Sequence, residues 1–247
     1  MEIKHLRYQG ERTSLLFSFI IVLFISLVIL QINFWLLILI IVFQLVYIIL
    51  SQKQLIGNSI FVNENQFSDI FQIAKDNAEE LKIKMPKVFI TQDPYLNAYT
   101  IGFKKPYSII LTSSLVDAFT RDELDFVIGH EMGHIKFGHS KYLSFISPIG
   151  RDIPFFSLLY AGWQRRTEYT SDRTGYSLIG KTKPAISALI KITVGNKLSN
   201  IVDIEEIIKQ IKEGKKGVST RAGEFLLTHP YVTNRIAEIV NFVNFSK

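Results

Sequence analysis

The sequence predicts an α+β fold: an N-terminal hairpin of two apolar helices, then a mostly helical domain with a small antiparallel sheet. Three observations support this prediction. Residues 13–52 contain no charged side chain. Residues 98–112 contain two short β-rich runs, and the segments after them repeat apolar residues at helical spacing. The 247 residues suit one folded domain with a small appendage.

The uncharged run is too long for one straight membrane span, because its helix would extend about 60 Å, twice the hydrocarbon thickness of a bilayer. It divides at residues 31–33, and we expect a transmembrane hairpin over residues 14–50, with helices at 14–30 and 34–50. A single tilted span is the alternative. The run is too long for a secretory signal and lacks its cleavage site. A hairpin buried in a soluble core would show polar faces, which are absent.

Positive charges flank the hairpin, at Lys4, Arg7, Arg12 and Lys53, and none lies between its helices. The positive-inside rule therefore predicts an integral membrane protein with both termini in the cytoplasm, in the plasma membrane if the source is bacterial. A single span would place the domain outside. The expected organisation is a cytoplasmic tail (1–13), the hairpin (14–50), a connector (51–65) and one domain (66–247).

Local signals predict the elements of the domain in order. Apolar spacing predicts a helix over residues 66–83, which Pro86 ends. A strand follows at 87–91, and a turn at 104–106 joins two further strands as a hairpin. Thr120 and Glu123 have the spacing of a capping box, which opens the next helix. The remaining expected elements are strands at 98–103 and 107–112, helices at 120–138, 157–179, 184–194, 201–211 and 232–245, and a loop at 214–217.

Composition excludes several classes of function. The chain has no cysteine, so disulfides, thiolate nucleophiles, iron–sulfur clusters and cysteine-based zinc fingers are excluded. The net charge of +6 is spread along the chain. Because no dense Lys/Arg cluster alternates with aromatic residues, no nucleic-acid partner is expected.

The sequence HEMGH at residues 130–134 is the sharpest chemical signal. On a helix, His130 and His134 project from one face and can bind one metal ion. Catalytic zinc takes three protein ligands and keeps one position for water. Glu131 is placed to accept a proton from that water and to return it to the leaving amine.

The third ligand defines the type of site. A metzincin would have glycine and histidine where Phe137 and Ser140 stand, so that class is excluded. His139 lies about 140° around a helix from His134. We therefore expect it to support the site or lie on the surface, not to bind the metal.

A glutamate on a following helix is the remaining type of third ligand. Glu168 and Asp172 lie four residues apart, and Glu168 follows His134 by 34 residues. One carboxylate can bind the metal while the other orients a ligand histidine. The helix that carries HEMGH is too polar for the bilayer core, so the chemistry is expected outside the membrane. Besides Glu131, its charged residues are Arg121, Asp122, Glu123, Asp125 and Lys136.

The ordered motifs resemble the HtpX-like membrane zinc metalloproteases, a family related to the CAAX prenyl endopeptidases. They are the apolar hairpin, Asn97-Ala98-Tyr99 with Gly102, VIGHEMGHIKFGH, RTEYTSDRTGY, and Thr228-His229-Pro230 followed by Arg235 and Ile236. The resemblance covers the whole chain. It implies a gluzincin-type domain that holds one Zn²⁺ through His130, His134 and Glu168, with Glu131 as the general base.

The resemblance also implies roles for residues that the spacing alone does not single out. Asn97 and His229 would line the cleft and hold the substrate or stabilise the oxyanion. Asp172 would orient a ligand histidine, and Arg235 would brace the site or form a structural ion pair. Bacterial quality-control members of the family carry hydrophobic spans between the zinc motif and the third ligand. Residues 140–167 leave no room for such spans, so substrate handling is not carried over.

The sequence thus predicts a membrane-anchored zinc endopeptidase with a cytoplasmic active site, acting in membrane-protein quality control or peptide processing. Its partners would be peptide or protein substrates, including membrane proteins, and the lipid bilayer. A non-catalytic zinc-binding scaffold is the alternative, although such descendants normally lose a ligand or the catalytic glutamate. A prenyl-peptide protease is a weaker candidate, because two spans cannot form a membrane chamber.

Overall fold

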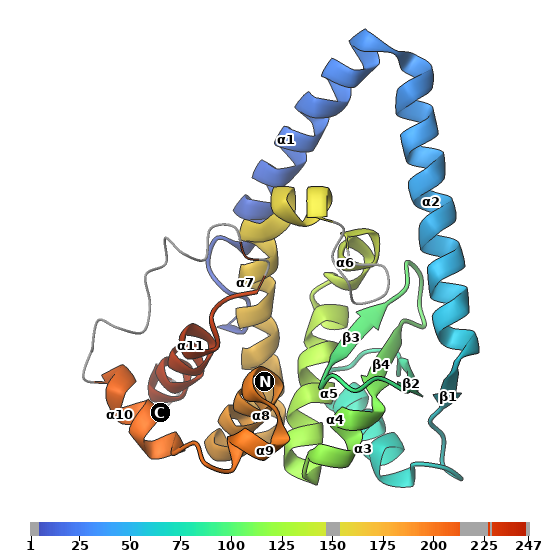
Figure 1. Cartoon of the computed structure of the whole chain (residues 1–247). Coiled ribbons are helices and arrows are strands. Elements are labelled where there is room, and N and C mark those ends of the chain that lie inside the picture. Colours follow the sequence, from blue (N-terminus) through green and yellow to red (C-terminus); the bar gives the residue numbers. More distant parts are fainter. Residues whose placement is uncertain (1–4, 147–153, 213–226, 228, 246–247) are drawn as a thin grey trace.

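Two long apolar helices rise from the domain and meet at Asn33, as the computed structural model shows (Figure 1). They are α1 (Glu11–Ile32) and α2 (Phe34–Gly57). The Asn33 side chain accepts a hydrogen bond from the amide of Leu36 at 3.1 Å and so caps α2. The two predicted apolar helices are confirmed, and both run beyond the predicted ends. The structure describes residues 5–146, 154–212, 227 and 229–245.

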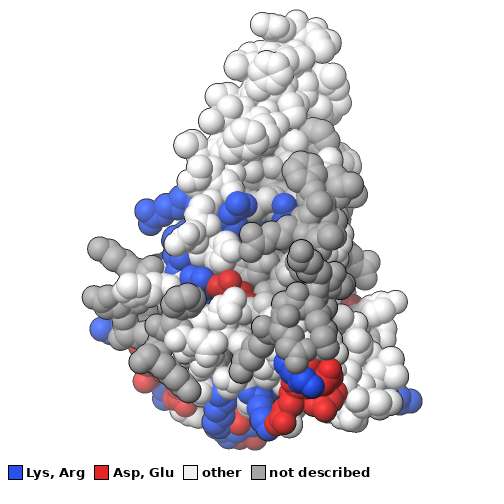
Figure 2. All heavy atoms as spheres, turned by 90° about the vertical axis from the view of Figure 1, so that its left-hand side faces the viewer, with Lys and Arg blue, Asp and Glu red and all other residues white. Residues whose placement is uncertain are grey.

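Both helices are long and apolar enough to cross a membrane. Only 6% of the apolar window of α1 and 11% of that of α2 is buried inside the protein. A hairpin packed in a soluble core would be mostly buried, so the structure does not support that alternative. On the face that Figure 2 shows, the upper part of the hairpin carries no charge, and Lys and Arg side chains gather where it joins the domain.

The domain contains one four-stranded sheet in the order β1-β2-β4-β3. The strands are β1 (Ser59–Phe61), β2 (Lys87–Thr91), β3 (Ala98–Ile101) and β4 (Ser108–Thr112). The predicted hairpin of β3 and β4 is confirmed. The sheet is mixed, however, and not antiparallel throughout, because the hairpin folds back so that β4 lies beside β2 and parallel to it. The expected connector is largely regular, since α2 extends through it to Gly57 and β1 follows.

Helices cover the sheet and form the rest of the domain (Figure 1). The predicted helices before and after the sheet are confirmed with small shifts at their ends, whereas the predicted loop at 214–217 lies outside the described residues. The helices are α3 (Ser68–Glu80), α4 (Ser113–Ala118), α5 (Arg121–Lys136), α6 (Ser140–Ile146), α7 (Pro154–Ile179), α8 (Thr182–Val194), α9 (Asn196–Ser199), α10 (Ile204–Lys212) and α11 (Val232–Phe245).

The capping box predicted at the start of α5 is present. Thr120 accepts a hydrogen bond from the Glu123 amide, and the Glu123 carboxylate accepts one from the Thr120 amide at 2.7 Å. Glu123 is buried and also receives hydrogen bonds from Ser187 and Lys191 of α8. The first turn of α5 is therefore held both by its own cap and by the neighbouring helix.

The apolar hairpin is packed against the domain through contacts of both of its helices. Phe19 of α1 meets Tyr160 of α7 edge to face, with ring centroids 5.8 Å apart. Gln44 of α2 donates a hydrogen bond to the carbonyl of Phe145 in α6 at 3.2 Å. Further along α2, Leu55 packs against the apolar side chains of the sheet. Both helices of the hairpin are thus fixed to the domain.

Helices α5 and α7 cross in very close contact because glycines occupy the crossing. A Cβ at Gly175 would lie 2.6 Å from the carbonyl oxygen of Phe126. A Cβ at Gly129 would lie 2.7 Å from Leu178, and one at Gly133 would lie 3.0 Å from the Cα of Ser171. Real Cβ atoms essentially never lie closer than 3.0 Å to another atom, and the neighbour of Gly175 is backbone, so a side chain at Gly175 would force the two backbones apart.

The crossing makes a direct test possible. Gly175→Ala is expected to cost roughly 2–3 kcal/mol through overpacking, more than the helix propensity that alanine adds. The midpoint of thermal unfolding in detergent should fall by roughly 5–10 °C. Gly162→Ala, on the same helix, is the control, because its Cβ would meet only arginine nitrogens at 3.8 Å or more. An unchanged midpoint in Gly175→Ala would show that the crossing is not tight.

Candidate active site

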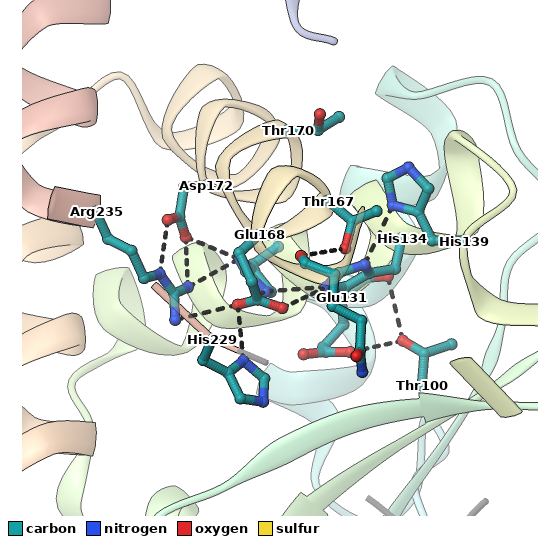
Figure 3. A network of polar contacts seen from close by, with 12 residues as sticks. Thr100, Glu131, His134, His139, Thr167, Glu168, Thr170, Asp172, His229 and Arg235 are labelled. Carbon is teal, nitrogen blue, oxygen red and sulfur yellow. Dashed lines mark hydrogen bonds and ion pairs between the residues drawn. The ribbon is translucent and has the colours of Figure 1, made fainter. Parts of the chain in front are cut away.

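Helix α5 places the two histidines of HEMGH on one face, as their spacing predicts. The Nε2 atoms of His130 and His134 lie 3.2 Å apart, and both rings are buried. Helix α7 brings Glu168 to them: its Oε1 lies 3.5 Å from Nε2 of His134, and its Oε2 lies 3.7 Å from Nε2 of His130. Figure 3 shows the side chains of His134 and Glu168 pointing toward one another from the two helices.

This group fits a metal ion in number, chemistry and spacing. One ligand atom from each of His130, His134 and Glu168 lies within 4.8 Å of the other two. Zinc bonds of 2.0–2.2 Å in a tetrahedral site separate ligand atoms by about 3.3–3.5 Å, close to the separations observed here. Two imidazole nitrogens and one carboxylate also form a donor set that catalytic zinc sites use. The arrangement can therefore hold a divalent cation with a position left for water.

The nitrogen of His130 that faces away from this group is held by Asp172. The His130 Nδ1 lies 2.9 Å from Asp172 Oδ1, which leaves Nε2 free to bind a metal. Burial alone would lower the pKa of His130, but the hydrogen bond that the ring donates to Asp172 and the charge of Glu168 outweigh burial and raise it. A bound cation would displace a proton from the His130 ring, because only the neutral imidazole binds a metal.

Arg235 of α11 contacts both carboxylates. Its guanidinium donates to the two oxygens of Asp172 at 2.8 and 2.6 Å, and Nη1 lies 3.2 Å from Glu168 Oε2. Burial would raise the pKa of each acid, but the charge of Arg235 more than offsets it and lowers both, that of Glu168 well below its usual range. Arg235 therefore lies at the site, in ion pairs with both carboxylates.

Glu131 lies beside His134 and Glu168 in the same cleft and is buried. Its Oε2 accepts a hydrogen bond of 2.6 Å from the hydroxyl of Thr100 on β3, which fixes the carboxylate toward the sheet edge (Figure 3). Sequence analysis did not identify Thr100. Alternation along the strand shows only which face a residue occupies, not which helix faces it.

Asn97 and His229 lie at the mouth of the site, as the family resemblance implies. Nδ1 of His229 lies 3.5 Å from Glu168 Oε2, and its side chain is 65% exposed. The backbone of Asn97 is held by hydrogen bonds with Thr112 of β4 at 3.0 Å. Both residues line the cleft, so they are placed to meet a bound molecule.

Two adjoining cavities of about 160 and 400 Å³ form this cleft. Asn97, Glu131, Glu168 and His229 line both of them. The smaller cavity follows residues 98–100 of β3, and the larger one continues along apolar side chains of α5 and α8. The apolar residues of the larger cavity are Phe126, Val127, Leu189 and Ile192.

His139 supports the site, one of the two predicted outcomes. It follows Gly138, whose φ of +78° turns the chain back after α5. Its Nδ1 lies 3.2 Å from Nδ1 of His134, and its Nε2 lies 3.1 Å from Oε1 of Glu11 at the start of α1. Burial lowers the pKa of His139 to about 4, so the ring is neutral at pH 7. Sequence analysis missed Glu11, whose partner is 128 positions away.

Comparisons with known proteins agree with this geometry. The model of peptidase family M48 matches residues 64–158 and 151–243. The chain is 31% identical over 205 residues to the plastoglobule-localized metallopeptidase 48 of Arabidopsis thaliana, covering 74% of this chain and 59% of that protein. It is 25% identical over 246 residues to a protease HtpX homolog of Streptococcus pyogenes, and this match covers 81% of this chain and 80% of that protein.

A solved structure gives the same picture for the fold. The crystal structure of Ste24p from S. mikatae is similar with a TM-score of 0.54 and 17% identity, and the match covers 93% of this chain and 65% of that one. The chain therefore spans about two thirds of Ste24p and somewhat less of the Arabidopsis peptidase. The resemblance to HtpX-like membrane metalloproteases is confirmed, and the chain belongs to peptidase family M48.

Proposed function

We propose that the protein is a zinc endopeptidase, with His130, His134 and Glu168 as the zinc ligands and Glu131 as the general base. The observation that carries this proposal is the convergence of these four side chains on one cleft. Bound zinc would lower the pKa of a water molecule to about 7 and polarise the scissile carbonyl. Glu131 accepts a proton from the attacking water and delivers it to the leaving amine.

The edge strand and the mouth of the cleft provide the substrate contacts. Residues 98–100 of β3 line the smaller cavity beside Glu131, so an extended peptide can lie along them and pair with the strand backbone. Asn97 and His229 are hydrogen-bonding side chains at the same opening and are assigned to holding the substrate or the developing oxyanion. Peptides and unfolded segments of membrane proteins are the substrates that an extended site favours.

The catalytic proposal has a direct test. Glu131→Gln should retain about one zinc per chain, measured by elemental analysis, because Glu131 is not a ligand. Casein cleavage by the detergent-purified protein should fall about 10³-fold, the usual contribution of a general base. Asp122→Asn is the control, because it makes the same charge change on α5. Asp122 forms an ion pair with Lys181 and is far more exposed than the buried Glu131.

The possible results separate the alternatives. If the wild-type protein contained no zinc, the proposed metal site would be ruled out. Wild-type protein that holds zinc but cleaves neither casein nor membrane-protein substrates would favour the non-catalytic scaffold. Equal cleavage by wild type and Glu131→Gln would exclude Glu131 as the base.

We also propose that the hairpin crosses the membrane twice and places the active site in the cytoplasm. The supporting observations are the uncharged tip of the hairpin and the basic side chains near its base (Figure 2). Helix α5, which carries HEMGH, lies on the domain side of this base (Figure 1). Of the flanking positive charges, Lys4 lies outside the described residues.

A pair of C-terminal fusions tests this orientation. A fluorescent protein that folds in the cytoplasm should be bright, and alkaline phosphatase, which requires the outside, should be inactive. The reverse result would mean a single span and an outward-facing enzyme. Fusions placed at Asn33 are the matched control, because the two-span arrangement predicts the opposite readout there.

A further inference from the structure

The second histidine of the metal group is connected to the membrane hairpin by a buried chain of hydrogen bonds. His134 Nδ1 meets His139 Nδ1 at 3.2 Å, and His139 Nε2 meets Glu11 Oε1 at 3.1 Å. All three residues are at most 3% exposed. Glu11 is the first residue of α1, so the contact joins the start of the first apolar helix to the metal group.

Only one arrangement of protons satisfies this chain while both rings are neutral. A carboxylate accepts hydrogen bonds and does not donate them, so Nε2 of His139 must donate to Glu11. Its Nδ1 is then an acceptor, and Nδ1 of His134 must donate to it. Nε2 of His134 is left without a proton and faces His130 and Glu168. The tautomer that Glu11 selects is the one that binds a metal.

The carboxylate of Glu11 is itself held in place from three sides. It forms an ion pair with Arg7 and accepts a hydrogen bond from the hydroxyl of Thr170. Thr170 lies on α7, two residues after Glu168, and its hydroxyl oxygen also accepts a hydrogen bond from the backbone amide of Tyr8 at 2.9 Å. Arg7 reaches the carbonyl of Phe137 at 3.1 Å, beyond the end of α5. The segment before α1 is therefore docked against both helices of the site.

We propose that Glu11 and His139 are positioning residues of the metal centre, and that together they fix His134 as Asp172 fixes His130. This inference rests on the proposed zinc site. It means that the segment leading into the membrane hairpin completes the site, in addition to anchoring the domain. A ligand histidine that loses such a partner typically binds metal 10–100-fold more weakly.

Zinc affinity of the full-length protein in detergent, measured by competition with a chelator, tests the proposal. Glu11→Leu and His139→Leu should each weaken zinc binding about 10–100-fold and alter the visible absorption of the cobalt-substituted protein. Glu11→Gln and His139→Asn keep an acceptor and should recover part of the loss. Arg173→Met is the control: it removes an ion pair with Glu238 and a contact with Tyr8, but no contact to His134. It should lower the unfolding temperature and leave zinc affinity unchanged.

A measurement on the wild type does not depend on the variants folding. The chain has five histidines, so ¹⁵N labelling of histidine alone gives few signals, and two-bond couplings identify each tautomer. In the zinc-loaded protein, His139 should carry its proton on Nε2. A proton on Nδ1 of His139, or wild-type zinc affinity in both leucine variants, would overturn this inference alone. A wild-type protein that binds neither zinc nor cobalt would overturn the proposed function, and this inference with it.

Discussion

The close crossing of α5 and α7 is the constraint on which the site depends. Helices normally lie 8–10 Å apart, and glycines at 129, 133 and 175 allow the backbones here to touch. Two of these glycines lie directly beside the two histidines, so the same contacts bring His130 and His134 to Glu168 of the facing helix. The side chains of His130, His134 and Glu168 thus meet where the two helix backbones are in contact.

Charge balance explains why the buried polar cluster tolerates its position. Counted as ionised at neutral pH, Glu131, Glu168 and Asp172 bring three negative charges, and Arg235 returns one positive charge. The remaining two negative charges match a divalent cation. Buried charges are stable only when they are paired, so a bound divalent cation and Arg235 would together balance the charge of the site.

Local signals in the sequence predicted most of the helices and the pair of histidines in HEMGH, because those features depend on spacing within one element. Glu168 lies on another helix and was predicted from its place after that motif. The capping box at Thr120, the HEMGH helix and the hairpin of β3 and β4 are of this kind. The parallel pairing of β2 with β4 was missed, because strand order depends on how the hairpin packs and not on its own residues. Glu11 was missed for the same reason: an isolated glutamate before an apolar run carries no sign of a partner beyond the next helices.

The fixed base of the hairpin has a consequence for how substrates arrive. Since α1 and α2 are packed on the domain at separate places, the hairpin is a rigid mount and not a flexible tether. On a bilayer, such a mount holds the cleft at a constant height and tilt. For the membrane-protein substrates proposed above, encounter would then depend on lateral diffusion in two dimensions, and the cleft would reach those stretches that leave the lipid at the matching height.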